Sequence, residues 1–133
     1  MTGAPTGIRL INANDQSVGA RKGWPTTSTV SSCKAAVVHL ARILSAELVG
    51  RGIRVNTLSP GPTDTTMFGR FAGEEQGNAI KSVLATNNPS KRMADPAEIA
   101  RLAVYLASDD SAYVVGADFL IDGGVAAVSP VGA

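Results

Sequence analysis

Three short apolar stretches of the chain alternate with segments that have a helical hydrophobic period. Gly7–Asn14 (GIRLINAN), Ile53–Pro60 (IRVNTLSP) and Ala117–Gly124 (ADFLIDGG) each have an apolar core that ends in polar residues, proline or glycine. Such stretches are typical of buried β-strands whose carboxyl ends open into loops. The pattern therefore predicts three strands.

The segment between the first two strands predicts a long helix. Ser28 or Thr29 can cap its start, and Gly50 or Gly52 can end it. Apolar residues recur at steps of three and four, which places them on one face, and we expect that face to be buried. This stripe consists of Val30, Cys33, Val37, Leu40, Leu44 and Leu48.

A second helix is predicted before the third strand. Asp95 has the features of an N-cap, Pro96 suits the first helical position, and Glu98 completes a capping box. Its expected buried stripe consists of Ile99, Leu102, Ala103 and Leu106. Residues 65–92 have a mixed pattern that glycines interrupt, which predicts broken helices of the kind that form a lid.

Strands that alternate with helices predict right-handed crossovers and a parallel sheet. Because the strands are apolar throughout, helices should cover both faces of that sheet. A chain of 133 residues fits one domain. The predicted fold class is α/β, with about three parallel strands in a single domain over residues 1–133.

Composition narrows the classes of function. Twelve Lys and Arg against 11 Asp and Glu give a net charge of +1, so nucleic acid is not an expected partner. No apolar run is long enough to cross a bilayer, and the first residues lack a secretory signal pattern. The single cysteine, Cys33, excludes an internal disulfide and is too few for a structural zinc site. We expect a cytoplasmic protein without a metal site or a membrane partner.

Several polar residues are spaced for chemistry. Lys34 and residue 30 are four apart on the predicted helix, a spacing that suits a phenol whose pKa is lowered by an ammonium group. Residue 30, however, is Val30. Ser17 follows the first strand, at the edge where open parallel sheets bind ligands. The turn SPGPTDT follows the second strand, and its backbone and hydroxyl groups could contact an amide or a phosphate.

These residues and their surroundings resemble the C-terminal half of a short-chain dehydrogenase/reductase with an NAD(P)-binding Rossmann fold. The resemblance is carried jointly by SxCKAA, GIRVNTLSPGPTDT, DPAEIA with LASDDSAYVVG, and DGG. It implies NAD or NADP as cofactor, a carbonyl or alcohol as substrate, and a homo-oligomer formed through the last helices and the last strand. Ser17 would polarise the substrate carbonyl, and Lys34 would hold the nicotinamide ribose. The implied cofactor-loop residues are Pro60, Gly61, Thr63 and Thr65.

The chain departs from the pattern of this family in two places. Val30 occupies the position of the catalytic tyrosine and cannot transfer a proton, while Tyr105 and Tyr113 are expected to lie far from it. The glycine-rich turn that cradles the cofactor pyrophosphate does not occur in the sequence. Two hypotheses follow: an NAD(P)-dependent oxidoreductase, or a catalytically inactive, truncated relative that acts as an interaction or structural subunit. The second implies an exposed edge on the first strand and self-association through it.

Overall fold

The computed structural model describes residues 9–13, 25 and 27–128. Within this part of the chain, three strands form one sheet in the order β1-β2-β3. They are β1 (Arg9–Ala13), β2 (Arg54–Pro60) and β3 (Asp118–Ile121). Both pairings are parallel. Each observed strand lies inside the apolar stretch that predicted it, so the three strands and their parallel arrangement are confirmed.

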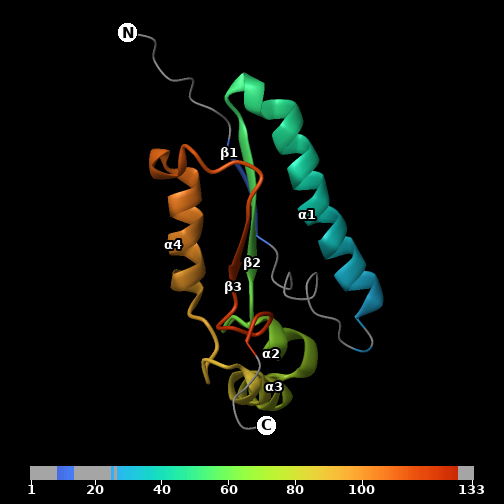
Figure 1. Cartoon of the computed structure of the whole chain (residues 1–133). Coiled ribbons are helices and arrows are strands. Elements are labelled where there is room, and N and C mark those ends of the chain that lie inside the picture. The colour runs from blue at the N-terminus through green and yellow to red at the C-terminus, as the bar shows by residue number, and fades with distance from the viewer. Residues whose placement is uncertain (1–8, 14–24, 26, 129–133) are drawn as a thin grey trace.

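Helices cover both faces of the sheet, as predicted. Helix α1 (Ser28–Leu48) packs against β2, and α4 (Pro96–Ala107) packs against β1 and β2 on the other side (Figure 1). Beyond the carboxyl end of β2 lie α2 (Met67–Ala72) and α3 (Glu74–Asn87). Two short 3-10 helices, η2 (Val49–Arg51) and η3 (Asp109–Ser111), follow α1 and α4.

The face of α1 that contacts the sheet differs from the predicted apolar stripe. Its buried residues are Val38, Ala41 and Ser45. The Ser45 hydroxyl donates a hydrogen bond to the carbonyl oxygen of Val55 in β2 at 2.5 Å, which satisfies this buried polar group. In contrast, Val30 and Leu40 are 46% and 51% exposed, and Cys33 is also exposed. The predicted burial of these three residues is therefore wrong.

The helix ends depend on local sequence and follow the predictions closely. The N-cap of α1 is Thr27, one residue before the predicted candidates, and its hydroxyl oxygen accepts a hydrogen bond from the Ser31 hydroxyl at 3.0 Å. Helix α1 ends at Leu48, before the predicted Gly50 or Gly52, and Gly52 instead ends the η2 turn that follows, with a left-handed φ of 73°. In α4, the Asp95 carboxylate accepts from the Ala97 N–H at 2.8 Å, and the capping box is complete.

The lid-like region consists of two helices in close contact. Gly73, with a φ of 82°, separates α2 from α3, which confirms the predicted break. Gly77 does not interrupt α3. A Cβ atom at Gly77 would lie 2.7 Å from the backbone nitrogen of Gly69 in α2, so the absence of a side chain lets the two helices touch.

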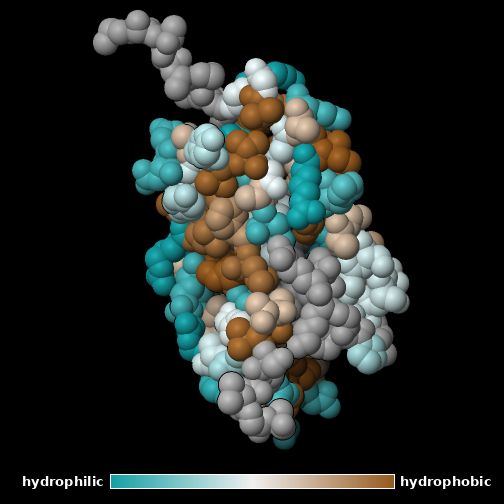
Figure 2. Space-filling model, viewed as in Figure 1, coloured by the Kyte–Doolittle hydropathy of each residue, from teal (hydrophilic) through white to brown (hydrophobic). Residues whose placement is uncertain are grey.

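The sheet edge at β3 is only partly covered. All four β3 residues are partly exposed, and Figure 2 shows a band of hydrophobic side chains down the middle of the face in view, between α4 and α1.

The buried apolar residues Val55, Leu58 and Leu106 form the centre of the core. None of the described helices is long and apolar enough to cross a membrane.

Candidate active site at the carboxyl edge of the sheet

The parallel topology brings the start of α1 and the loop after β2 to the same end of the molecule. All three strands point the same way, and α1 runs back alongside β2 (Figure 1). Val30 and Lys34, near the start of α1, therefore lie toward the end at which β2 finishes in Pro60. Open parallel sheets bind ligands at this carboxyl edge. This edge is therefore the candidate site.

Of the four predicted cofactor-loop residues, Pro60 ends β2, and Gly61, Thr63 and Thr65 lie in the loop that follows it. Pro60 and Gly61 are buried, whereas Thr63 and Thr65 are partly buried. The Thr63 hydroxyl donates a hydrogen bond to the carbonyl oxygen of Gly61 at 3.0 Å. The Thr65 hydroxyl oxygen accepts from the Met67 N–H, at the start of α2, at 3.4 Å. Both hydroxyl groups thus help to shape the loop that carries them.

Gly61 allows the ends of β2 and β3 to approach closely. Its N–H donates a hydrogen bond to the Ile121 carbonyl oxygen at 3.0 Å, and a Cβ atom added to it would lie 2.6 Å from the Cα atom of Asp122. The buried Asp122 carboxylate accepts from the N–H groups of Gly124 and Ala126 at 2.8 and 2.7 Å. Asp122 therefore stabilises the turn after β3.

The proton-transfer position has no phenol nearby. Lys34 is partly buried on α1, and Val30 lies one turn before it on the same side of the helix. The chain has two tyrosines. Tyr105 is on α4, across the sheet from α1, and Tyr113 is exposed after η3, so neither can replace the missing group. Ser17 lies outside the described residues.

A family model described as enoyl-(acyl carrier protein) reductase matches residues 6–126 of the chain. The chain belongs to the short-chain dehydrogenase/reductase family. This confirms the resemblance that the motifs indicated. The turn after β2 and the Val30–Lys34 pair can therefore be compared with the corresponding positions of this family.

Curated relatives in this family match most of the chain. It is 34% identical over 116 residues to 2-(S)-hydroxypropyl-CoM dehydrogenase 3 of Xanthobacter autotrophicus, covering 86% of this chain and 46% of that protein. It is 35% identical to the inactive 2-(S)-hydroxypropyl-CoM dehydrogenase 2 of the same organism, covering 86% of this chain and 50% of that protein. The chain thus spans about half the length of these relatives.

A solved structure confirms that the fold is the one used by this family. A short chain dehydrogenase family protein from Francisella tularensis superposes with a TM-score of 0.79 at 27% identity, covering 92% of this chain and 52% of that protein. The α/β fold with parallel strands is therefore shared with short-chain dehydrogenase/reductase structures. As with the curated relatives, the match covers part of the longer protein.

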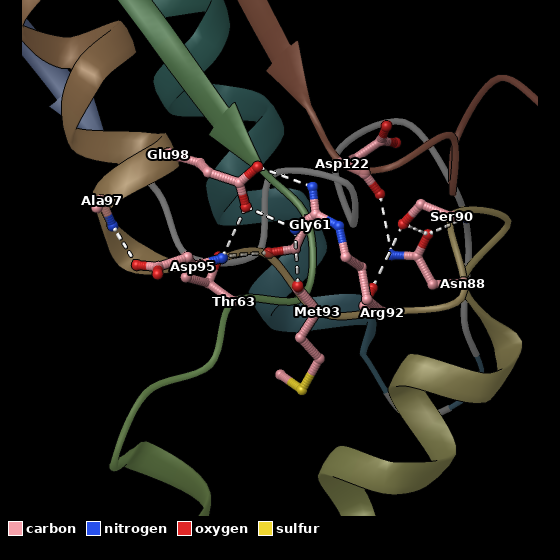
Figure 3. Close-up of polar contacts among 10 residues, drawn as sticks. All are labelled: Gly61, Thr63, Asn88, Ser90, Arg92, Met93, Asp95, Ala97, Glu98 and Asp122. Atoms are coloured by element: carbon pink, nitrogen blue, oxygen red, sulfur yellow. Dashed lines mark hydrogen bonds and ion pairs between the residues drawn. The ribbon is translucent and has the colours of Figure 1, made fainter.

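Two polar contacts hold the lid and the sheet end together, and the sequence did not predict either of them. The buried amide of Asn88, just after α3, donates to the carbonyl oxygen of Asp122 at 3.2 Å (Figure 3). The Asn88 side-chain oxygen accepts from the Ser90 N–H at 2.9 Å. Lys81 of α3 forms an ion pair with Asp64 at 2.6 Å. The Asn88–Asp122 and Lys81–Asp64 contacts join residues that are far apart in the sequence, so no local pattern could predict them.

A hollow of about 540 Å³ lies beside the loop that carries Asp64. It is lined by Asp64, Lys81, Ser82, Ala85, Lys91, Arg92, Met93, Ala94, Asp95 and Pro96. Among the charged groups that line it, Lys81 and Asp64 pair with each other, whereas Arg92 pairs with Glu98. In the described ranges, no group of three or more His, Cys, Asp or Glu side chains is arranged to hold a metal ion.

The Arg92–Glu98 pair gives the start of α4 a distinct pH dependence. The guanidinium of Arg92 donates to both Glu98 carboxylate oxygens, at 2.6 and 2.7 Å. Together with the Asp95 N–H, it lowers the pKa of Glu98 from 4.5 to about 2. A carboxyl group with a depressed pKa in the folded state stabilises that state above its unfolded pKa. The contribution is lost as the pH falls toward the folded pKa.

We therefore expect Glu98→Gln to be less stable than the wild type near neutral pH, with a difference that shrinks as the pH falls from about 4.5 toward 2. Urea unfolding of both proteins at a series of pH values measures this difference. Glu75→Gln, at an exposed position in the first turn of α3, controls for the loss of one negative charge at a helix start. Identical pH profiles for the two variants would contradict the prediction.

Proposed function

We propose that the chain forms the C-terminal half of a Rossmann-type doubly wound sheet and supplies the nicotinamide end of an NAD(P)-dependent hydride-transfer site. The proposal is carried by the position of Pro60–Thr65 at the carboxyl edge of the sheet, at the same end of the molecule as Lys34. The hydroxyl group of Thr65 and the ammonium of Lys34 are donors suited to a ribose and a carboxamide, and the Thr63 hydroxyl oxygen, whose proton is donated to Gly61, can accept a hydrogen bond. When bound, the nicotinamide donates or accepts the hydride.

The residues of this chain have separate roles in the proposed site. Lys34 holds the nicotinamide ribose, and Ser17 donates a hydrogen bond to the oxygen of the carbonyl or alcohol substrate. Val30 occupies the position from which a proton would reach that oxygen, and an isopropyl group cannot transfer one. The proposed site therefore retains cofactor and substrate contacts but lacks its acid/base group, which typically contributes about 10²–10⁴-fold to a rate.

A second candidate function is that of a catalytically inactive interaction subunit. It is favoured by the exposed apolar side chain of Val30 and by similarity to a relative named as inactive. Among the described strands, β1 pairs only with β2, which leaves its other edge available for self-association. On this hypothesis the chain forms oligomers, and sedimentation velocity at increasing protein concentration would detect them.

Cofactor binding distinguishes the two candidates. Trp24 is the only tryptophan, and its emission can be quenched by energy transfer to a bound reduced nicotinamide. We expect saturable quenching by NADH or NADPH and by reduced nicotinamide mononucleotide, which lacks the adenylate half of the cofactor. Lys34→Met should weaken all of these interactions severalfold, while Lys91→Met should not. No saturable binding of any of them would overturn the oxidoreductase proposal and favour the inactive subunit.

A further inference from the structure

The loop after β2 is paired with the segment that precedes α4. Thr63 and Ala94 form an isolated parallel bridge. The Ala94 N–H donates to the Pro62 carbonyl oxygen at 2.9 Å, and the Asp64 N–H donates to the Ala94 carbonyl oxygen at 2.9 Å. These two hydrogen bonds lie on either side of Thr63. The backbone position of Ala94 therefore sets the position of Thr63.

One carboxylate holds the residues on both sides of Ala94. Glu98 accepts two hydrogen bonds from the guanidinium of Arg92, and its Oε2 atom also accepts from the Asp95 N–H at 2.9 Å (Figure 3). Arg92 additionally donates to the Met93 carbonyl oxygen at 3.2 Å. Bidentate pairing of an arginine with a carboxylate has a defined geometry. The Glu98 carboxylate thus connects the two ends of the segment from Arg92 to Asp95 through hydrogen bonds.

We propose that Glu98 is a positioning residue for the cofactor loop. It holds Arg92 and Asp95, which fix Ala94, and Ala94 fixes Thr63 through the parallel bridge. A capping box alone would only stabilise the first turn of α4. The ion pair with Arg92 additionally holds the chain on the N-terminal side of Ala94, which the capping box does not contact. The effect on a nicotinamide rests on the proposed function, whereas the effect on the loop does not.

The two roles of Glu98 can be separated by substitution. Glutamine serves in a capping box as glutamate does, because its side-chain oxygen can accept the N-cap N–H. It cannot accept both N–H groups of a guanidinium through a carboxylate, so Glu98→Gln removes the bidentate pair and keeps the cap. Arg92→Lys retains the charge but loses the planar fork of donors. Both variants therefore disrupt the Arg92–Glu98 ion pair, here called the clamp, and leave the first turn of α4 capped.

Amide hydrogen exchange of the ligand-free chain tests the positioning role. We expect Glu98→Gln and Arg92→Lys to speed exchange of the Asp64 and Ala94 N–H groups by about threefold or more, since exposed pairs make small contributions. Exchange at Thr57, within β2, should stay unchanged. Glu75→Gln is the matched control and should alter none of these amides. Faster exchange confined to the first turn of α4 would show that Glu98 is only a cap and would overturn the proposal.

A parallel titration with reduced nicotinamide mononucleotide connects the clamp to the proposed function. If the wild type binds this probe, both clamp variants should raise its dissociation constant by a similar factor, about threefold. Unchanged affinity in both variants would overturn the link to the cofactor loop. If the wild type does not bind it, the proposed function fails. The exchange rates of Asp64 and Ala94 would still decide whether Glu98 positions the loop.

Discussion

Val30→Tyr is expected to raise the rate of carbonyl reduction by this chain about 10²–10⁴-fold, the usual contribution of a positioned acid/base group. The new phenol would lie one helical turn before Lys34, on the same side of α1. An ammonium at that distance favours the phenolate and brings the pKa of the phenol toward neutrality. Val30 is 46% exposed, so a larger side chain fits there without overpacking the core. Oxidation of NADH and NADPH with a panel of aldehydes and ketones measures the rate.

Val30→Phe is the matched control for this substitution. It adds the same ring without the hydroxyl group and should leave the rate at the wild-type level. Equal rates for the two variants would contradict the assignment of residue 30 as the proton-transfer position, provided that both bind the reduced cofactor equally well.

Gly61→Ala is expected to lower the free energy of unfolding by about 1–3 kcal/mol, the usual cost of overpacking a well-packed site. The added Cβ atom would lie 2.6 Å from the Cα atom and 2.9 Å from the carbonyl oxygen of Asp122. These are backbone atoms, so the end of β3 must shift to make room. The same shift would disturb the turn that carries Thr63 and should weaken nicotinamide binding. Urea unfolding and the Trp24 quenching titration measure the two effects.

Gly50→Ala provides the comparison. Gly50 lies in η2, and a Cβ atom there would have nothing within 4 Å. Surface substitutions away from special contacts usually change stability by less than about 0.5 kcal/mol. If Gly61→Ala proved as stable as Gly50→Ala, the close approach of β2 and β3 described above would be incorrect.

The elements of the fold were predictable because their signals are local. Strands buried in a parallel sheet are continuous apolar stretches, and this pattern alone predicts β1, β2 and β3. The start of α4 was predictable to the residue, since Asp95 and Glu98 form a capping box within a single turn and Pro96 suits the first helical position.

The buried face of α1 was not predictable from hydrophobic periodicity. The residues that face the sheet include Ala41 and Ser45, and Ser45 is buried because it donates to the Val55 carbonyl oxygen. The sequence does not indicate that a serine is buried, because its burial depends on a hydrogen-bond acceptor that only the structure identifies. The more hydrophobic stripe, with Val30 and Leu40, lies about a quarter of a turn away. Periodicity alone cannot choose between two such stripes.

The site shows the same division between local and distant signals. The turn from Pro60 to Thr65 was found through its resemblance to a family motif, and the structure places it at the end of β2. The bridge between Thr63 and Ala94 joins two segments separated by α2 and α3. Nothing in either segment specifies the other. Glu98 was therefore predicted as a helix cap, and its pairing with Arg92 emerged only from the structure.

The placement of α1 against the sheet has a consequence for how this sequence can vary. Val38, Ala41 and Ser45 anchor the helix, while Val30 is about half exposed. An aromatic or an aliphatic residue at position 30 should thus have little effect on the stability of the fold. Substitutions at this position can change catalysis without changing how α1 packs against the sheet. A saturation library at residue 30 would report on chemistry alone. The exposure of residue 30 indicates that the fold accommodates either an aliphatic or a phenolic side chain there.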